Sequence, residues 1–398
     1  MRIAFLAACL FAIATPAWSR VAPQMPAAME QAPVERAIAN VSADQRLAPA
    51  QRERLLGRLH LIAYAQRDVR MTRYSNGEWQ PQPIGPCGDT AYAFEGQRLC
   101  PYGYEGLATG ELPASTSPWS FLSRSHLNAA RTHYQRAIAL DDTNLRAHLG
   151  LAYVLDELNE DDAARVELRR IIAISDRAFT RNERGEFIWW EEYTVLNEAV
   201  AHLGDLARSR SDRALVAGLR RRLGNARPAG FVTPIVVPLS DAPFHELIEP
   251  ASPVEFDFSG VGDTRARGWL TQDAAWLVWD PERRGVVSSG FDMIGQRTWA
   301  VFWSDGFEAM RSLDDNGDGE LAGAELGGLA LWRDANVNGR SEPGEVTPLS
   351  AFGVVGLAAR GREERPGLLV APAGVRFEDG TQRPLYDWTP GVADGASS

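Results

Sequence analysis

The sequence predicts two structural classes in one chain: an all-α region in its N-terminal half and an α+β region in its C-terminal half. Apolar residues recur at intervals of three and four between residues 126 and 174, which is the helical period. Six prolines fall between residues 227 and 253, a density that excludes a long helix. Beyond them, short apolar runs alternate with Asp-, Asn- and Gly-rich turns. A chain of 398 residues also exceeds one ordinary core.

The N-terminal segment 1–19 has the pattern of a secretory signal peptide. One Arg precedes an apolar run from Ile3 to Ala14, and Pro16 then breaks the helix. The run is shorter than the roughly 20 residues that span a bilayer. We therefore expect a secreted or periplasmic protein without a membrane span.

Two cysteines, Cys87 and Cys100, remain after this segment, in a loop region (87–100) rich in Pro, Gly and Tyr. An oxidising compartment favours one local disulfide between them, and the alternative is a thiol site. The formal net charge of −11 disfavours binding to nucleic acid.

Residues 20–226 are expected to form the helical domain. Small and aromatic residues recur along 126–174 at helical spacing, and the DDTN turn separates the first two helices. The positions are Ala130, Tyr134, Ala137, Leu140, Leu149, Gly150, Tyr153, Ala164, Leu168 and Ile171. The pattern resembles the tetratricopeptide repeat, which implies a stack of helices that binds a protein partner. Helical stretches at 51–66 and 187–208 would be neighbours in this stack, and the alternative is a plain helical bundle.

Two acidic loops, 314–325 and 334–345, follow the calcium-loop register: oxygen side chains at positions 1, 3, 5 and 12, and Gly at position 6. Calcium takes six to eight oxygen ligands, and a coiled loop gathers many of them from one segment. The candidate ligands of the first loop are Asp314, Asn316, Asp318, Glu320 through its carbonyl, and Glu325. Those of the second are Asp334, Asn336, Asn338, Arg340 through its carbonyl, Glu342 and Glu345. The alternative for either loop is an ordinary turn.

The segment 255–388 resembles a calcium-binding, EF-hand-like module of secreted bacterial proteins, including haemolysin-type ones. The matching strings are FDFSGVG, VWDPERRG, SDGFEAMRSLDDNGDGE, LALWRDANVNGRSEPGE and GVRFEDGTQRPLYDW. The resemblance implies that 254–390 is the calcium module. Residues 391–398 are expected to be a disordered tail. The turns 257–262 and 280–285 lack ligands at acidic positions, and Arg284 occupies position 5 of the latter. Two Ca²⁺ sites are therefore expected.

Between the two loops, the apolar residues at 326, 329, 330 and 332 predict one short helix. The second loop is expected to bind calcium more weakly, because Arg340 lies beside its ligands and positions 3 and 5 carry only Asn. The proline-rich segment 227–253 is expected to be an exposed, extended linker.

The sequence contains no catalytic motif that we can identify. None of its six histidines has a second ligand at zinc spacing, although His126 and His133 would share a helix face. The WWEEY string from Trp189 to Tyr193 suits either a carbohydrate-like site or core packing, and core packing is favoured. The predicted function is a calcium-binding protein without enzymatic activity, in which Ca²⁺ staples the C-terminal module and the helical repeats bind a protein. The alternatives are an extracytoplasmic hydrolase and an envelope structural protein with supporting calcium sites.

Overall fold

The computed structural model describes residues 31–68, 118–177, 188–225, 232–260 and 264–391, with short segments at 21–23, 71–73, 79–81, 92–94, 97–99, 101–103, 180 and 228–229. The predicted signal peptide, Cys87 and Cys100, and residues 392–398 lie outside the described residues. Within the part of the chain that is described, no helix has the length and apolar character needed to cross a membrane.

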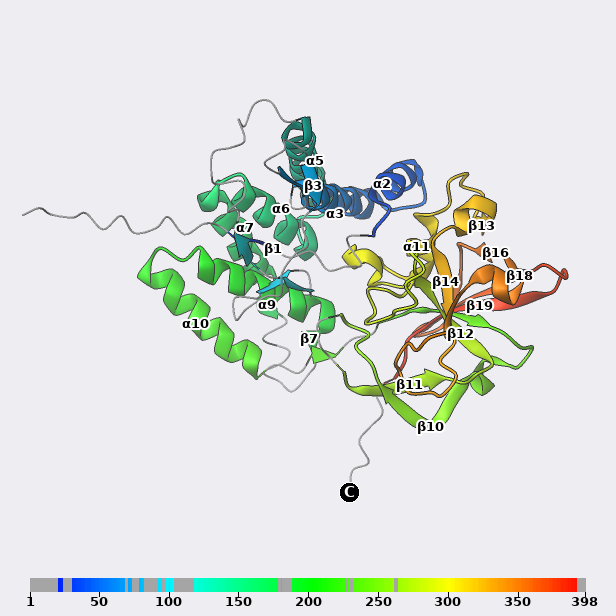
Figure 1. The fold of residues 1–398 in the computed structure, drawn as a ribbon. Coiled ribbons are helices and arrows are strands. Elements are labelled where there is room, and N and C mark those ends of the chain that lie inside the picture. The colour runs from blue at the N-terminus through cyan, green and yellow to red at the C-terminus, as the bar shows by residue number, and fades with distance from the viewer. Residues whose placement is uncertain are drawn as a thin grey trace, which may run out of the picture.

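Among the described residues, the helical part consists of α2 and α3 near the N-terminus and five further helices (Figure 1). The helices are α2 (Val34–Ala43), α3 (Pro49–Asp68), α5 (Pro118–Leu140), α6 (Leu145–Glu157), α7 (Asp161–Ile174), α9 (Trp190–Asp205) and α10 (Arg210–Gly224). From α3 to α10 each helix packs against the next, and their apolar faces form one core. The helices expected within 51–66, 126–174 and 187–208 are thus confirmed.

Tyr134 of α5 shows how this stack packs. Its side chain is fully buried between α3 and α6. A Cβ atom on Gly150 would lie 2.1 Å from the Cζ atom of Tyr134, and one on Gly57 would lie 2.8 Å from its Cδ1 atom. The two glycines therefore let α3 and α6 approach the ring closely.

The C-terminal part is built on a curled antiparallel sheet of nine strands. The strand order is β13-β16-β18-β19-β9-β12-β14-β15, and β17 pairs with β18. These strands are β9 (Ile235–Pro238), β12 (Ala274–Trp279), β13 (Glu320–Ala322), β14 (Leu329–Trp332), β15 (Val346–Pro348), β16 (Val354–Ala358), β17 (Arg362–Arg365), β18 (Leu368–Phe377) and β19 (Gln382–Trp388). A separate hairpin of β10 (Ile248–Glu255) and β11 (Ala266–Leu270) packs beside it.

Short elements complete the fold. The only α-helix described after residue 232 is α11 (Gly306–Arg311). The 3-10 helices are η1 (Phe244–Glu246), η2 (Thr298–Ala300), η3 (Gly323–Leu326) and η4 (Leu349–Phe352). The minor strands are β1 (Val21–Pro23), β2 (Met71–Arg73), β3 (Trp79–Pro81), β4 (Tyr92–Phe94), β5 (Gln97–Leu99), β6 (Pro101–Gly103), β7 (Ile188–Trp189) and β8 (Pro228–Ala229).

The large sheet has a core on each of its two faces. Successive side chains of a strand point to opposite faces. In β12, Leu277 and Trp279 join one core, whereas Trp276 and Val278 join the other. The second core is rich in aromatic rings. In it, the ring of Trp269 contacts the rings of both Trp276 and Trp332 edge to face.

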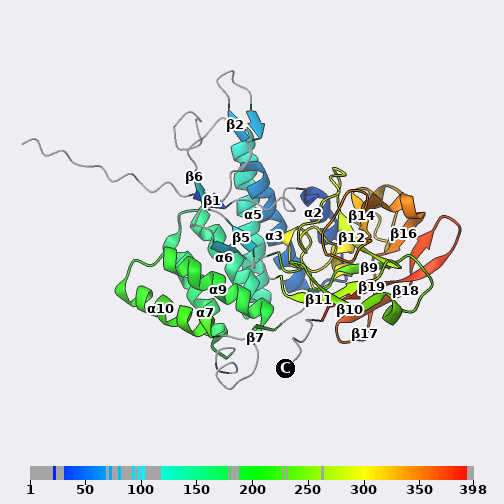
Figure 2. The ribbon, with the colours of Figure 1, turned by 60° about the horizontal axis from the view of Figure 1, so that its bottom comes forward.

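The first core of the sheet is completed by the N-terminal helices. Val34, Ala37 and Val41 of α2 and Leu55 and Leu59 of α3 are buried in the same cluster as the strands. Figure 2 shows α2 and α3 between the remaining helices and the sheet. Because α3 also contributes to the core of the helical stack, the two parts of the molecule share an element instead of meeting through a linker.

Arginines join the helices to a tight turn at 299–302. Trp299, Ala300 and Phe302 have φ angles of 53°, 56° and 62°, a left-handed conformation that is costly for bulky residues. Arg58 Nε donates to the carbonyl of Ala300 at 2.9 Å, and Arg54 Nη2 to that of Phe302 at 2.9 Å. These buried hydrogen bonds stabilise the turn against the helices.

Three expectations differ from the structure. The proline-rich segment is not an exposed linker throughout, because its residues 235–238 form β9, a fully buried strand in the middle of the large sheet.

The helix expected between the two acidic loops is instead η3 followed by β14. Leu329 and Leu331 face one core and Ala330 and Trp332 the other, and burial on alternate sides requires a strand.

The third difference concerns the arrangement around the acidic loops. An EF-hand places a helix on each side of its loop. Here α11 precedes the first loop, but β13 and η3 lie within it. The second loop connects β14 and β15, whose residues Trp332 and Val346 pair across it. The flanking elements are therefore mainly strands of the curled antiparallel sheet.

Candidate functional site

The first acidic loop is organised by the carboxylates at its two ends. The backbone N–H groups of Gly317 and Gly319 donate to Oδ1 and Oδ2 of Asp314 at 2.8 and 2.9 Å. Glu325 Oε1 accepts from the N–H of Asp315 at 2.8 Å, and its Oε2 from that of Ala322 at 3.0 Å. Asp314 and Glu325 are 5% and 7% exposed, so both ends of the loop hold a buried carboxylate.

Positions 3, 5 and 7 of the first loop lie nearer to solvent. Asn316 Nδ2 donates to Asp318 Oδ2 at 2.9 Å, and the N–H of Glu320 donates to Asp318 Oδ1 at 2.8 Å. The side chain of Glu320 accepts instead from Arg376 Nε at 2.9 Å. Glu320 thus keeps only its carbonyl for the role that the loop register gives it.

The second acidic loop repeats this network. Asp334 Oδ2 accepts from the N–H of Gly339 at 2.7 Å, and its Oδ1 from that of Asn338 at 3.1 Å. Glu345 accepts from the N–H groups of Ala335 at 2.9 Å and Glu342 at 3.1 Å. In both loops the position-12 glutamate therefore reaches back to the amides of positions 2 and 9.

The remaining candidate ligands of the second loop also contact one another. Asn336 Nδ2 and Asn338 Nδ2 donate to the carboxylate of Glu342 at 2.7 and 3.2 Å. The N–H of Arg340 donates to Asn338 Oδ1 at 2.8 Å. The structure thus brings Asn336 and Asn338 together at the carboxylate of Glu342, whereas Asp334 and Glu345 face the loop amides.

The turn at 280–285 has the same backbone shape without the same side chains. Asp280 accepts from the N–H groups of Arg284 at 2.8 Å and Gly285 at 2.9 Å, as a position-1 aspartate does in the acidic loops. Positions 4 and 6 have positive φ in all three turns: Arg283 (54°) and Gly285 (68°), Gly317 (72°) and Gly319 (93°), Val337 (58°) and Gly339 (71°). Residue 291, at position 12 of the 280 turn, is Phe, so this turn has no closing carboxylate.

The donor set of the two loops consists of carboxylate, amide and carbonyl oxygens, which is the set that calcium prefers. A carboxylate oxygen has more than one lone pair, so an oxygen that accepts one N–H keeps acceptor capacity. Over the described residues, no group of three or more His, Cys, Asp or Glu side chains is arranged to hold a metal ion. In the structure the carboxylates at positions 1 and 12 face the loop amides instead.

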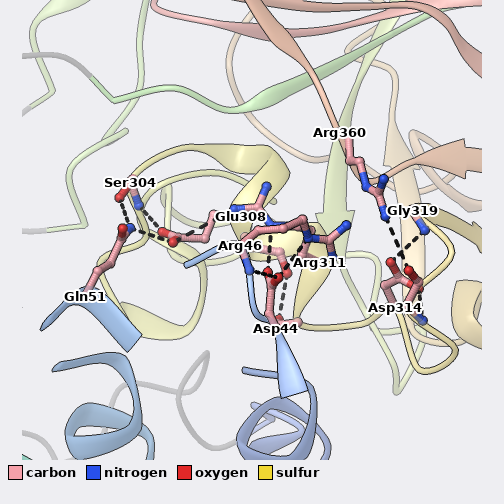
Figure 3. Close-up of polar contacts among 12 residues, drawn as sticks. Asp44, Arg46, Gln51, Ser304, Glu308, Arg311, Asp314, Gly319 and Arg360 are labelled. Carbon is pink, nitrogen blue, oxygen red and sulfur yellow. Dashed lines mark hydrogen bonds and ion pairs between the residues drawn. The ribbon is translucent and has the colours of Figure 1, made fainter. Parts of the chain in front are cut away.

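Residues far away in the sequence surround the first loop. Arg360 Nη2 donates to the carbonyl of Gly317 at 3.3 Å, and its guanidinium lies against Gly319, where a Cβ would be only 2.5 Å from Nε (Figure 3). Helix α2 contacts the start of the loop through Arg36 and Asn40. No pattern in the sequence pointed to these three residues, because each is remote from the loop and ordinary in its local context.

The second loop is supported by an aromatic residue. Trp269 Nε1 donates to Asp334 Oδ2 at 2.8 Å, and both side chains are buried. The second loop was expected to bind calcium more weakly, partly because of Arg340, and this stays a prediction. The first loop also has arginines around it: Arg36, Arg360 and Arg376.

Three histidines meet between α3 and α5. His60 Nδ1 lies 2.9 Å from His126 Nδ1, the rings of His60 and His133 stack at 5.3 Å, and His133 Nδ1 lies 2.7 Å from a carboxylate oxygen of Glu53. Burial, with the neighbouring histidines, lowers the pKa of His60 to about 4. His126 and His133, which the spacing places on one helix face, are thus joined by His60 from α3.

Two carboxyl groups are buried at α11, one from β19 and one from the helix itself. Asp387 of β19 is fully buried and accepts from the N–H of Gly306 at 2.7 Å. Burial raises the pKa of Asp387 to about 8, and the nearby Asp305 adds to this effect. Burial also raises the pKa of Glu308, whose carboxylate accepts from Gln51 of α3 at 2.6 Å (Figure 3).

The WWEEY string runs into α9, which begins at Trp190. The side chains of Trp189, Trp190 and Glu191 lie outside the described residues, and the rest of the helix packs into the core. Leu196, Val200 and Leu203 are buried in the helical core, and Tyr193 packs against it. This arrangement agrees with the core-packing interpretation of the helix.

The fold and the loops together define a class: a helical-repeat region joined to an antiparallel sheet domain that carries paired acidic loops. The tetratricopeptide repeat model matches residues 121–177, which include most of α5 and all of α6 and α7. The SPM domain model matches residues 236–388, from within β9 to the end of β19. The region that resembles a calcium module thus lies within the SPM domain match.

One curated relative is the iron-regulated protein FrpA of Neisseria meningitidis serogroup C. The two chains are 32% identical over 107 residues, which are 26% of this chain and 10% of the relative. The match therefore covers about a tenth of that protein's length, and the likeness concerns a segment.

Proposed function

We propose that this chain is a calcium-binding protein with two sites, one in each acidic loop. The observation that supports this proposal most strongly is that both loops fold around the same network. In each, the position-1 aspartate accepts from the position-6 amide, and the position-12 glutamate accepts from the position-2 amide. Ordinary turns have no reason to repeat a contact between positions 2 and 12.

In the proposed first site, Asp314, Asn316, Asp318 and Glu325 hold the ion with side-chain oxygens, and Glu320 adds its carbonyl. In the second, Asp334, Asn336, Asn338, Glu342 and Glu345 would act in the same way, with the carbonyl of Arg340. When bound, calcium would cancel the repulsion between carboxylates that each loop gathers.

The proposed role of calcium is structural. Glu325 closes a loop that begins directly after α11 and contains β13, and Glu345 closes the β14–β15 hairpin. Both loops are parts of the large sheet, so an ion that binds only the folded form would stabilise the whole C-terminal domain. Extracellular sites of this type bind at about 0.1–1 mM calcium, which suits the proposed secreted or periplasmic location.

The helical repeats are proposed to bind a protein partner. The repeat match at 121–177 supports this part, because tetratricopeptide repeats commonly mediate contacts between proteins.

The test is the thermal stability of the full chain with calcium and with chelator. At 10 mM calcium and a Kd of about 1 mM, each site would add about 1.4 kcal/mol, and both together would raise the midpoint by roughly 6–12 °C. Glu325→Gln and Glu345→Gln should each remove about half of this increase. Glu363→Gln, on the exposed strand β17, is the matched control and should keep the whole increase. Equal midpoints in calcium and chelator would contradict the proposal.

A further inference from the structure

Helix α2 lies at the entrance of the first acidic loop, although almost 280 residues separate them in the sequence. Asn40 Nδ2 donates to the carbonyl of Ser312 and to Asp315 Oδ1, both at 2.9 Å. Arg36 Nε donates to Asp315 Oδ1 at 2.7 Å, and its Nη2 donates to the carbonyl of Leu313. Two side chains of one helix thus hold three residues around the start of the loop: Ser312, Leu313 and Asp315.

The helix is itself fixed against the sheet domain. Val34, Ala37 and Val41 are at most 4% exposed, in the core that also contains Leu313. Just beyond the helix, Asp44 pairs with Arg311 of α11 at 3.2 Å (Figure 3). Arg36 and Asn40 therefore extend from a rigid support.

The residue that they hold, Asp315, is at position 2 of the loop and is not a candidate ligand. Its carboxylate is an anchor, because Oδ1 accepts from both Arg36 Nε at 2.7 Å and Asn40 Nδ2 at 2.9 Å. Its backbone N–H donates to Glu325 Oε1 at 2.8 Å. When the side chain of Asp315 is fixed, its backbone N–H is also held in place, and this N–H orients the carboxylate of Glu325 at position 12.

We infer that Arg36 and Asn40 are positioning residues of the first calcium site, so that α2 completes this site from the other end of the chain. The inference rests on the proposed function, since it concerns the affinity of the same loop. Calcium binding at the first loop and docking of α2 are then linked, and each strengthens the other to the same extent. Binding to a loop that is already ordered also costs less conformational entropy.

The second loop provides an internal comparison. Its position 2 is Ala335, which has no carboxylate that a helix could hold, and its position-1 residue Asp334 is fixed by Trp269. Loss of the contacts from α2 should therefore weaken the first site and leave the second unchanged.

Two opposite effects must be separated for Arg36. Its positive charge near the loop repels a cation, so removal of that charge alone would strengthen binding. Its hydrogen bonds order the loop, so their loss would weaken binding. Asn40 is neutral and exerts only the second effect, and Arg36→Lys keeps the charge but loses the forked geometry.

The test is calorimetric calcium titration of full-length variants in which one loop has been disabled. In the Glu345→Gln background, which leaves the first loop, Asn40→Ala and Arg36→Lys should each raise the Kd for calcium about three- to tenfold. In the Glu325→Gln background, which leaves the second loop, they should change nothing. Ser42→Ala, on an exposed position of the same helix, is the matched control. Asp315→Asn tests the anchor from the side of the loop, and a thermal melt in chelator verifies that each variant folds.

Each outcome is informative. Weaker binding that is confined to the first loop supports the inference. An unchanged Kd for Asn40→Ala, with tighter binding for Arg36→Ala, would show that α2 acts only through charge and would overturn it. If the Glu345→Gln parent with α2 intact binds no calcium, the proposed function fails at the first loop, which is a different result from a loss caused by the α2 variants.

Discussion

Asp387 carries a pH dependence that one substitution should remove. The side chain lies at the centre of the sheet domain, fully buried, with Oδ2 accepting from the N–H of Gly306. Burial raises the pKa of Asp387 from 3.8 to about 8. In the unfolded chain the group ionises near pH 4, whereas in the folded chain it stays protonated up to about pH 8.

The sign and size of the effect follow from this difference. Between pH 4 and pH 8 the folded state binds one more proton than the unfolded state, so the free energy of unfolding falls as pH rises. One pH unit corresponds to about 1.4 kcal/mol, which gives an upper limit of about 4 kcal/mol between pH 5 and pH 8. Relaxation around a buried charge reduces such values, and we expect about 2–4 kcal/mol, or roughly 5–15 °C in the midpoint.

Asp387→Asn keeps an acceptor for Gly306 but cannot ionise. The assay is the thermal midpoint at pH 5, 6, 7 and 8 in constant calcium, for the parent, Asp387→Asn and the control Asp379→Asn, which alters an exposed turn. The parent and the control should lose stability as pH rises, and Asp387→Asn should lose clearly less. Parallel curves for the parent and Asp387→Asn would refute the reasoning, because the buried group would then not be the source of the dependence.

Two further predictions concern packing. Leu59→Ala in α3 should cost about 2–5 kcal/mol, because Leu59 is buried in the core that the helices and the sheet share. It should lower both the midpoint of helix unfolding, followed by circular dichroism, and that of tryptophan fluorescence, to which seven buried tryptophans of the sheet domain contribute. Leu140→Ala, at a 57% exposed position, should leave both midpoints unchanged. If Leu59→Ala shifts only one signal, the two parts unfold separately. Gly150→Ala should destabilise the helical stack by roughly 1–3 kcal/mol, because the new Cβ would lie 2.1 Å from the Tyr134 ring. Gly218→Ala is the control: its Cβ would have no atom within 4 Å, so the better helix propensity of Ala should stabilise α10 by up to about 1 kcal/mol. Equal effects of the two substitutions on urea unfolding would contradict the packing account.

The helices were predictable because each buries one side. Ala130, Tyr134 and Ala137 recur at three and four, and this stripe is the one that the stack buries. The turn shape of the acidic loops follows from spacing for a related reason, because their contacts run between positions of one short segment. Calcium binding by these loops stays a prediction.

The strands β9 and β14 were not predictable in the same way. Each is a short apolar run that is buried on both faces, and such a run has no period that separates a strand from a helix. Pro234 precedes β9 and Pro238 ends it, and in the sequence these prolines indicate a linker. Proline is also compatible with the end of a strand, where no ladder donor is needed.

The docking of α2 and α3 on the sheet was beyond the reach of local patterns. Arg36, Asn40 and Arg58 are ordinary residues for a helix surface, and their partners lie more than 200 residues away. Asp387 also gave no signal, because a single acid in a strand usually faces solvent.

The central claim is that the two acidic loops, and not the related turns, bind calcium. The most direct measurement is the stoichiometry of calcium binding to the full chain by calorimetry, repeated with Glu325→Gln and with Glu345→Gln. We predict two ions per chain, and one for each variant at concentrations that saturate the intact loop. A stoichiometry of zero would make the loops ordinary turns, and a stoichiometry of four would show that the turns at 257–262 and 280–285 bind metal as well; either result would contradict the account.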